Sequence, residues 1–519
     1  MSAARSFAPT ASPSSAKLKL FCVQHAFPCV VYSCSAMLLI LRRVRSLSLS
    51  ARGLGSSRLL SAGQGRTASD GGGEGESIIS IDRSGLYQPP PPTPSGGFIP
   101  ASTPLGLELE TLISMRGPIS VAEYMKQALC HPSHGYYMRK DVFGKAGDFT
   151  TAPEISQMFG ELIGVWCVSL WEQMGRPAKV RLVEVGPGRG TLMNDLLRAA
   201  SSFPAFRAAL SVHLVDVSPA LRAIQEETLA AHTTASPVLG AGAPPPLSVA
   251  WHGDLTEVPA DAPLLLVAQE LFDALPVHQF EYTEDAGWCE RLVDVDEGAG
   301  GLRFVLSRGA TPASWAFLQS KDGRGDRGLI APATAETTEA EVHRIEMADA
   351  APGDRVEVCP AGLALTEDIA HRIATSGGGA LFIDYGYNHA SGDSVRAIKD
   401  HEFVNMLTDP GMADLSADVD FSSLARVGDA TKGVVAHTAV GQGEFLTNMG
   451  IQQRLAALLQ QDNMDDDTAE ALFESYERLV EEDQMGTVYK AMALTHESIP
   501  VPAGFPLPSS ASKGDGSAA

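Results

Sequence analysis

In the middle of the chain, segments whose apolar residues recur with the spacing of a strand are followed by segments with the spacing of a helix. Continuous short apolar runs are typical of strands buried on both faces of a sheet, and residues 264–268 are the clearest example. Stretches with helical spacing occupy residues 191–197 and 221–225. This alternation predicts an α/β fold in which helices cover a mainly parallel sheet. The other predicted strands are residues 183–185, 212–215, 247–251 and 379–386.

Two amphipathic helices are expected before the first strand. One begins near Ser120, and its apolar positions recur every three or four residues. The other covers residues 155–174 and has one strongly apolar face. We therefore expect residues 106–179 to form an N-terminal helical cap over the ligand-binding edge of the sheet. The loop at residues 144–153, between the two helices, could close over a ligand.

The pattern changes between the fourth and fifth strands. Residues 288–306 alternate like a hairpin with a turn at residues 298–301, which predicts a small β-insertion in the sheet domain. Amphipathic helices are expected further on, at residues 445–460 and 468–482. The predicted sections are a core with insertions at 180–445, C-terminal helices at 446–502 and a disordered tail at 503–519.

A glycine-rich turn joins the first strand to its helix. Gly186, Gly188 and Gly190 form a Gly-x-Gly-x-Gly pattern directly after the strand. Glycine is required where a turn is tight, or where a ligand approaches the backbone more closely than a Cβ atom allows. The N–H groups at the start of the next helix can also bind a polar ligand. In a chain with 50 glycines, an ordinary strand-to-helix turn would give the same pattern, so its context matters.

Acidic side chains follow the other strands at the points where they end. Asp216 follows the second strand, Asp254 the third, and Glu270 and Asp273 the fourth. Because the carboxyl ends of parallel strands meet at one edge of a sheet, these residues predict a ligand site there. An acid in the position of Asp216 can bind the ribose hydroxyls of an adenosine, and Asp254 could reach the adenine amino group. Asp216 could instead cap the helix that follows it.

The glycine turn also distinguishes between two adenosine ligands. A dinucleotide fingerprint has the spacing Gly-x-Gly-x-x-Gly, and here the third glycine comes one residue early. Glu184 lies inside the motif, where a carboxylate would repel a pyrophosphate but attract the cationic amino group of S-adenosylmethionine. The charge pattern therefore favours S-adenosyl-L-methionine over NAD. The expected donor pocket consists of Glu184, Gly186, Gly188, Gly190, Asp216 and Asp254.

Longer blocks of sequence add to these single motifs. They are residues 147–161 (Gly-Asp-Phe-Thr-Thr-Ala-Pro-Glu-Ile-Ser-Gln-Met-Phe-Gly-Glu), 183–190, 270–277 and 443–450. Together they resemble the MidA family, and the similarity extends over about residues 116–496. The resemblance implies a Rossmann-like fold of the S-adenosylmethionine-dependent methyltransferases. It also implies symmetric dimethylation of an arginine in a core subunit of NADH dehydrogenase during assembly of respiratory complex I.

Two positions depart from the family pattern. Gln269 stands before the acid of the fourth-strand motif, where Asn is usual. The substitution keeps the amide but lengthens the side chain by one methylene, which affects how a substrate would be positioned. Asp216 stands where Glu is common and has the same charge on a shorter side chain.

Methylation of an arginine requires carboxylates close to its guanidinium group. A guanidinium has a pKa above about 12 and is a poor nucleophile while protonated. Carboxylates can orient it, localise its charge and accept the departing proton. We expect Glu270 and Asp273 in these roles, with Glu154 from the covering loop as a third, although Glu154 also suits the first turn of a helix. Residues that could contact substrate or only fix loops are Asp384, Tyr385, Arg396 and His401.

The first 69 residues have the composition of a targeting sequence. They contain nine Lys or Arg and fourteen Ser, and no Asp or Glu. Such a leader is typical of an organellar transit peptide, so we expect a mitochondrial, matrix protein with a disordered linker at residues 70–105. A plastid leader is an alternative. A membrane anchor at residues 20–41 is another, but polar residues and a proline interrupt that stretch, which disfavours stable membrane insertion.

Charge and cysteine content narrow the class of partner. The formal net charge is −23, and loss of the leader with its nine positive charges takes it to −32. So acidic a surface disfavours nucleic acid and suits a basic protein partner, although a merely solvated acidic surface would look the same. The four cysteines beyond the leader are widely scattered, which argues against a disulfide framework. Cys130, His131 and His134 lack a second ligand cluster, so no metal site is expected.

Several functions remain open from the sequence. The leading hypothesis is a mitochondrial protein arginine methyltransferase that acts in complex I assembly. A non-catalytic assembly chaperone could retain the same fold and hold a subunit on its acidic surface. A methyltransferase with a small-molecule substrate would need a narrow pocket without a peptide groove. An NAD-dependent dehydrogenase is disfavoured by the charge of the glycine turn.

Overall fold

The computed structural model describes most of the chain beyond residue 102. The predicted leader at 1–69 and nearly all of the predicted linker at 70–105 lie outside the described residues. Helix α2 (Pro104–Arg116) already begins inside the predicted linker. The Thr103 hydroxyl accepts the Gly106 N–H and so caps the helix, and Leu105 in its first turn is buried. The described residues are 103–139, 151–233, 246–296, 301–319, 345–346, 350–461 and 464–507.

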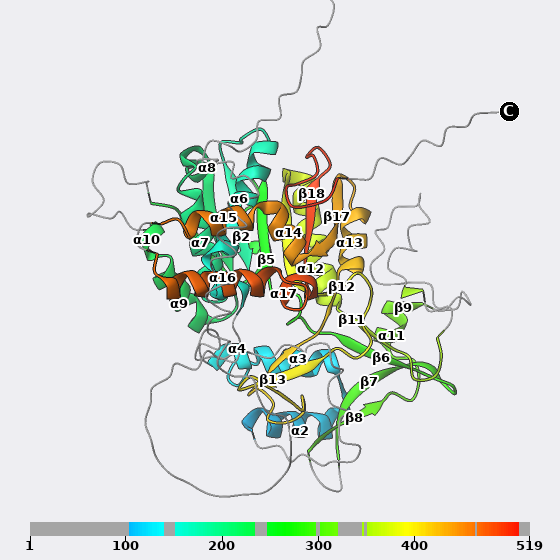
Figure 1. The fold of residues 1–519 in the computed structure, drawn as a ribbon. Helices are drawn as coiled ribbons and strands as arrows, with labels where there is room; N and C mark the ends of the chain where they lie inside the picture. Colours follow the sequence, from blue (N-terminus) through cyan, green and yellow to red (C-terminus); the bar gives the residue numbers. More distant parts are fainter. Residues whose placement is uncertain are drawn as a thin grey trace, which may run out of the picture.

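A central twisted sheet organises the larger part of the molecule (Figure 1). Its strands follow the order β17-β18-β12-β5-β2-β3-β4, and short β16 (Val419–Asp420) extends the end of β12. All neighbours pair in parallel except β18, which runs antiparallel to both β12 and β17. The five strands predicted from sequence are confirmed. The bounds are β2 (Val180–Val185), β3 (Leu210–Val215), β4 (Val249–His252), β5 (Leu264–Gln269), β12 (Gly378–Tyr387), β17 (Val434–Gly441) and β18 (Tyr489–His496).

Helices cover both faces of this sheet. Successive residues of β5 point to opposite faces, so that Leu265 belongs to one apolar core and Leu266 to the other. Both side chains are fully buried, which explains why this strand reads as a continuous apolar run. Helices on the Leu265 side include α6 (Gln157–Gln173), α7 (Thr191–Ala200), α8 (Pro204–Ala209), α14 (Gln442–Met449), α15 (Ile451–Leu458) and α16 (Asp466–Val480). Those on the Leu266 side include α12 (Pro360–Ser376) and α13 (Phe421–Ala430).

A smaller β-layer lies beyond the carboxyl edge of the main sheet (Figure 1). The predicted hairpin is confirmed as β7 (Gly287–Val295) paired antiparallel with β8 (Leu302–Leu306). It belongs to a larger sheet with β1 (Ile119–Ser120), β6 (His278–Thr283) and β11 (Arg355–Val358). A three-stranded sheet, β13 (Arg396–Lys399), β14 (Glu402–Val404) and β15 (Asp414–Ser416), lies beside it. The short remaining elements here are α11 (Pro312–Phe317), β9 (Leu318–Gln319) and β10 (Ile345–Glu346).

The predicted N-terminal cap at 106–179 is not one unit. Helices α2 and α3 (Val121–Cys130) pack on the smaller β-layer, in a core of their own, whereas α6 packs on α7 and the main sheet. Two glycines of α6 explain this close packing, since a Cβ atom on Gly160 would lie 2.6 Å from Asp195 Cβ, and one on Gly164 would lie 3.0 Å from the Leu196 carbonyl oxygen. Within the described part of this section, the ligand edge is lined by Cys130 at the end of α3, by Tyr137 of α4 (Tyr136–Arg139), and by residues at α5 (Ala152–Ile155).

The prediction of C-terminal helices at 446–502 needs correction. Strand β18 lies inside that section and pairs with β12 and β17 in the main sheet. Most of its residues are apolar and buried on both faces of the sheet, which fits an inner strand. The expected helix at 445–460 is broken at Gly450, whose φ of 93° is left-handed. The predicted tail begins too early, since Phe505 is buried against Phe445. Short α17 (Met485–Val488) precedes β18.

No helix in the described part of the chain is both long enough and apolar enough to span a bilayer. The stretch at 20–41, considered above as an anchor, lies outside that part.

Candidate active site

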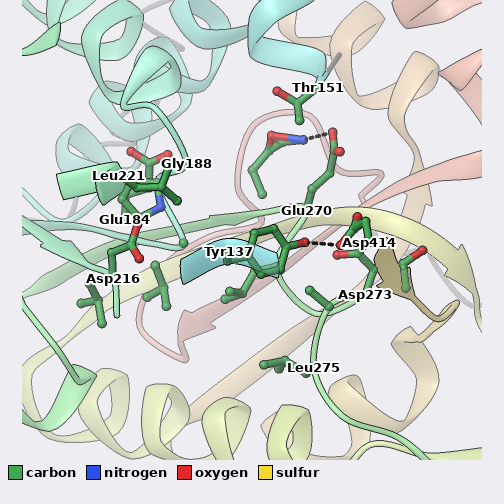
Figure 2. Close-up of a pocket in the computed structure, with 18 of the residues that line it drawn as sticks. Tyr137, Thr151, Glu184, Gly188, Asp216, Leu221, Glu270, Asp273, Leu275 and Asp414 are labelled. Carbon is green, nitrogen blue, oxygen red and sulfur yellow. Dashed lines mark hydrogen bonds between the residues drawn. The ribbon is translucent and has the colours of Figure 1, made fainter. Parts of the chain in front are cut away.

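A cavity of about 600 Å³ opens at the carboxyl edge of the main sheet. Its floor consists of the ends of β2 to β5 and β12, and residues of α4, α5 and the β13–β15 sheet form the opposite walls. Figure 2 shows two groups of side chains along it. Glu184, Gly188 and Asp216 lie at one end, and Glu270, Asp273 and Asp414 lie at the other. We call these the donor end and the acceptor end.

The glycine turn forms the wall of the donor end. Gly186, Gly188 and Gly190 all have left-handed φ angles, of 69°, 52° and 82°, which other residues adopt only at a cost. Gly186 and Gly188 line the cavity. Gly190 does not line it and instead forms the N-cap of α7. The predicted turn is therefore present, and its third glycine, Gly190, is the residue at which α7 begins.

Glu184 is the most strongly perturbed acid at the donor end. Its side chain lines the cavity, yet the residue is only 3% exposed, and Oε2 has no hydrogen-bond partner among the described residues. Burial, with a smaller contribution from the charge of Asp216, raises the pKa of Glu184 to about 8. A buried carboxylate oxygen without a donor fits a cationic or N–H-bearing ligand, and it opposes a phosphate.

A fully buried glutamine connects three strand ends. Gln225, on α9 (Pro219–Thr228), donates to the Gly188 carbonyl oxygen and to Asp216 Oδ2, both at 2.8 Å. Its carbonyl accepts from the indole N–H of Trp251 on β4, at 3.1 Å. The other oxygen of Asp216 accepts the Ser218 N–H at 2.8 Å, so Asp216 both lines the cavity and fixes the start of α9. Sequence reasoning missed Gln225, because a lone glutamine on an amphipathic helix resembles a solvent-facing residue.

Asp254 lies at the mouth of the donor end. The residue is exposed and lines the cavity. Its Oδ1 accepts the N–H of Thr256 at 2.8 Å and the hydroxyl of Thr256 at 2.6 Å, which caps the short helix η2 (Leu255–Glu257). Asp254 Oδ1 therefore stabilises the start of η2, while the carboxylate as a whole still borders the cavity.

The turn after β5 forms the floor of the acceptor end. Glu270 has a φ of 47°, unusual for a residue with a side chain. The turn is held by Asp384 at the end of β12, which is fully buried. Its Oδ2 accepts the backbone N–H groups of Leu271, Phe272 and Asp273 at 3.1, 2.9 and 3.2 Å. Asp384 thus fixes the loop that presents the predicted catalytic acids, which decides the role left open for it by the sequence.

Replacement of Asp384 by Ala is expected to destabilise the fold. The change leaves two buried N–H groups and one partly buried N–H group without this acceptor, and we expect a loss of about 2–4 kcal/mol in the free energy of unfolding. Urea titration of the Asp384→Ala variant would measure the shift in midpoint. Asp285→Ala, at an exposed turn between β6 and β7, provides the control and should change stability by less than about 0.5 kcal/mol. Equal midpoints for both variants would contradict this role.

Asp273 is the buried acid of the acceptor end. Its Oδ2 accepts the hydroxyl of Tyr385 at 2.7 Å, and Oδ1 has no partner among the described residues. Burial raises the pKa of Asp273 to about 6, and the Tyr385 hydrogen bond and the charge of Arg396 limit the rise. Burial also raises the pKa of Tyr385 well above its usual range, so the hydroxyl remains a donor. Arg396 lies 4.7 Å over the Tyr385 ring and pairs with Asp418 at 2.5 Å.

The other two predicted catalytic acids lie in different settings. Glu270 Oε1 accepts from the side-chain amide of Gln269 at 2.6 Å, the bond drawn at Glu270 in Figure 2. It also accepts from the Ala152 N–H at 3.3 Å. The longer amide of Gln269 therefore contacts the acid beside it. Glu154 lies in the first turn of α5 and faces Arg189 of the glycine turn at 3.7 Å. Glu154 therefore lines the cavity and also sits in a helical first turn, and its catalytic role stays a prediction.

The structure also bears on four other features considered in the sequence, which are His401, the covering loop, a metal site and the cysteines. His401 lines the cavity at its mouth. Most of the loop at 144–153, including the first four residues of the block at 147–161, lies outside the described residues. Within the described ranges no group of three His, Cys, Asp or Glu side chains is arranged to hold a metal ion. There, Cys130, Cys167, Cys289 and Cys359 are all free thiols.

Comparison with known proteins agrees with this geometry. The model of a MidA-like family, described as "Putative S-adenosyl-L-methionine-dependent methyltransferase", matches residues 162–440. The chain belongs to this family. Its cofactor is S-adenosyl-L-methionine, as the donor-end charge predicted.

The chain is also similar to curated relatives and to solved structures. The protein arginine methyltransferase NDUFAF7, mitochondrial, of Xenopus tropicalis is 39% identical and covers 76% of this chain and 87% of its own length. The human protein of the same name is also 39% identical, over 77% of this chain and 86% of its own. A Burkholderia thailandensis protein crystallised with S-adenosyl-homocysteine has a TM-score of 0.59 at 26% identity, covering 78% of this chain and 97% of that one. The Rossmann-like methyltransferase fold predicted for this MidA-like chain is confirmed.

Proposed function

We propose that this chain is a protein arginine N-methyltransferase that uses S-adenosyl-L-methionine. One observation carries the choice of acceptor, which is the charge of the cavity. Among the described residues, two arginines, Arg189 and Arg396, line it. Eight acidic side chains also line it, namely Glu154, Glu184, Asp216, Asp254, Glu270, Asp273, Asp368 and Asp414. A cavity with this excess of negative charge attracts a cationic acceptor and disfavours an anionic one. The names of the NDUFAF7 relatives support the same acceptor.

The acceptor end supplies what methylation of a guanidinium requires. When bound, the cofactor provides a methyl group on a positively charged sulfur, which keeps the bonding electrons as the methyl group joins the acceptor nitrogen. Asp273 would accept the proton that this nitrogen loses, since its Oδ1 has no other partner among the described residues and its raised pKa makes it a stronger base than an ordinary Asp. Glu270, held by Gln269, would orient the guanidinium. Glu154, the third predicted acid, would act from the opposite wall, beside Arg189.

The donor end supplies contacts for the cofactor. Glu184 would face its amino group, Gly186 and Gly188 would allow close approach of its amino-acid part, and Asp216 would bind the ribose. Asp254, which lines the cavity at its mouth, would face the adenine, and Gly190 would act through the N-cap of α7. These roles are supported by the lining of the cavity and by the orphan oxygen of Glu184.

Binding of the donor is expected to release a proton through Glu184. The pKa of this acid is about 8 in the free chain, so it is mostly protonated at pH 7. A cationic amino group beside it favours the charged form and lowers that pKa. Affinity should therefore rise with pH between 7 and 8 and level off above 8. Calorimetric titration at pH 7, in two buffers with different ionisation enthalpies, measures the protons released. Their number should fall in the Glu184→Gln variant, and an unchanged number would assign the proton to another group.

The finer assignments complete the proposal. The family resemblance supports a core subunit of NADH dehydrogenase as the substrate and symmetric dimethylarginine as the product. The mitochondrial designation of the relatives supports a mitochondrial location, and the acid-free leader supports import into the matrix.

A labelled methyl donor tests this function. The chain would be incubated with isolated core subunits of complex I and S-adenosylmethionine carrying an isotopic methyl group. Mass spectrometry of the hydrolysed subunits should find the label in symmetric dimethylarginine. Label in monomethylarginine alone would correct the product. Absence of label from arginine, with donor binding intact, would leave a chaperone that binds the cofactor without catalysis.

A further inference from the structure

The β13–β15 sheet contributes one wall of the acceptor end, a placement that no sequence motif predicts. Six of its residues, including the β13–β14 turn, line the cavity: Arg396, Ile398, His401, Phe403, Asp414 and Ser416. Asp414 is the one acid among them. It lies opposite Ile398 in the antiparallel register and is only 8% exposed. A buried carboxylate on a cavity wall is costly unless the site needs its charge or hydrogen bonds.

Asp414 is held in the same way as Asp273. Its Oδ1 accepts the hydroxyl of Tyr137 at 2.7 Å (Figure 2). Tyr385 donates to Asp273 at the same distance. Burial and the charges of both Asp414 and Asp273 raise the pKa of the Tyr137 hydroxyl well above 10. Both carboxylates therefore act electrostatically on the same hydroxyl, and both line the acceptor end. Each tyrosine fixes one oxygen of its partner and remains a neutral donor.

The backbone fixes the spacing of the two acids. The Ala417 N–H, directly after β15, donates to the Asp273 carbonyl oxygen at 2.9 Å. Asp384 holds the other side of the same turn through the N–H groups of residues 271–273. A backbone hydrogen bond thus joins the strand that contains Asp414 to the turn that contains Asp273. The cationic side chain of this wall, Arg396, pairs with Asp418 and stacks on Tyr385.

From this arrangement we infer that Asp414, in addition to Glu270, is a carboxylate that holds the acceptor guanidinium, opposite Asp273. The inference rests on the proposed function and deepens it, because it names the group that selects arginine. A planar guanidinium presents N–H groups on two edges, and two carboxylates from different elements can engage both. Asp414 then binds and orients the substrate, while Asp273 accepts its proton.

The test compares binding of a cation with binding of its neutral counterpart. Nα-acetyl-arginine amide and Nα-acetyl-citrulline amide have nearly the same shape and differ in charge. Each would be titrated by NMR into the chain saturated with S-adenosylhomocysteine. We expect the wild-type chain to prefer the arginine compound, and Asp414→Asn to reduce that preference at least tenfold. The affinity for S-adenosylhomocysteine should stay unchanged.

A matched variant controls for charge and folding. Asp409→Asn makes the same change close to Asp414 in the chain but outside the cavity lining, at a residue with a φ of 49° that Asn accepts readily. It should retain the wild-type preference. If Asp414→Asn fails to bind S-adenosylhomocysteine, Asp414→Glu and Asp414→Gln, which match each other in size, replace it, and only the Glu variant should prefer arginine.

The outcomes separate the inference from the proposed function. A wild-type preference that survives in Asp414→Asn, or in Asp414→Gln, overturns the role of Asp414 and leaves an arginine acceptor in place. A wild-type chain that binds arginine no better than citrulline overturns the arginine acceptor itself. Loss of the preference in Asp414→Asn, but not in Asp409→Asn, supports the inference.

Discussion

Replacement of Asp273 by Asn is expected to slow methyl transfer by about 100- to 10,000-fold, the usual contribution of a positioned general base. Asn keeps the shape of Asp and can still accept the Tyr385 hydroxyl, but it cannot take a proton from the acceptor nitrogen. The loss should therefore appear in kcat, with the affinity for S-adenosylmethionine unchanged. Single-turnover transfer of a labelled methyl group, with donor binding measured separately by calorimetry, gives both quantities.

The pH profile provides a sharper signature of the same residue. The pKa of Asp273 is about 6, so the wild-type carboxylate is charged at neutral pH and becomes protonated as the pH falls through 6. The rate should then fall about tenfold per pH unit below 6, and this limb should be missing from Asp273→Asn. Tyr385→Phe is the matched control, because it removes the hydroxyl that lowers the pKa of Asp273 and should move the limb to higher pH. A wild-type limb that persists unchanged in Asp273→Asn would assign the base to another residue.

Replacement of Gly188 by Val is expected to abolish donor binding. Gly188 lines the cavity with a φ of 52°, and its carbonyl oxygen accepts from Gln225, so a branched side chain would both strain the turn and project at the donor end. We expect the affinity for S-adenosylmethionine to fall at least about 100-fold, equivalent to roughly 3 kcal/mol. Calorimetric titration measures the change directly.

A control variant must show whether backbone strain at a glycine lowers donor affinity by itself, without a change in the donor site. Gly175 has a φ of 83° and lies after α6, away from the cavity, and no described atom lies within 4 Å of the position that a Cβ atom would take there. Gly175→Val should therefore lower stability in a similar way and leave donor affinity intact. Wild-type affinity in Gly188→Val would remove the glycine turn from the donor site.

The features that sequence predicted well are those with a local signal. The strands of the parallel set are short and largely apolar, and acids such as Asp216 and Glu270 follow directly after β3 and β5, so their meeting at one edge follows from the topology of parallel sheets. The charge of Glu184 beside the glycines is equally local. That single charge is enough to favour a sulfonium donor over a dinucleotide.

The features that sequence missed depend on contacts across long separations. Tyr137 and Asp414 are 277 residues apart in the chain, and neither belongs to a motif. Gln225 acquires its role only when three strand ends meet around it. The division of the predicted helical cap has the same origin, since the apolar face of α6 fits a partner helix that sequence periodicity does not specify.

The position of β18 has a consequence for how the molecule is made. This strand is the last of the sheet in the chain, yet it lies between β12 and β17. Until residues 489–496 have emerged from the ribosome, or from a translocation pore, the buried segment of β12 at Ala380–Ile383 has an unpaired edge. Folding must wait for this late strand, and non-local pairing of this kind is slow. A chain terminated before β18 would present an apolar edge to other chains, so loss of a small C-terminal segment would lead to aggregation rather than to a smaller working enzyme.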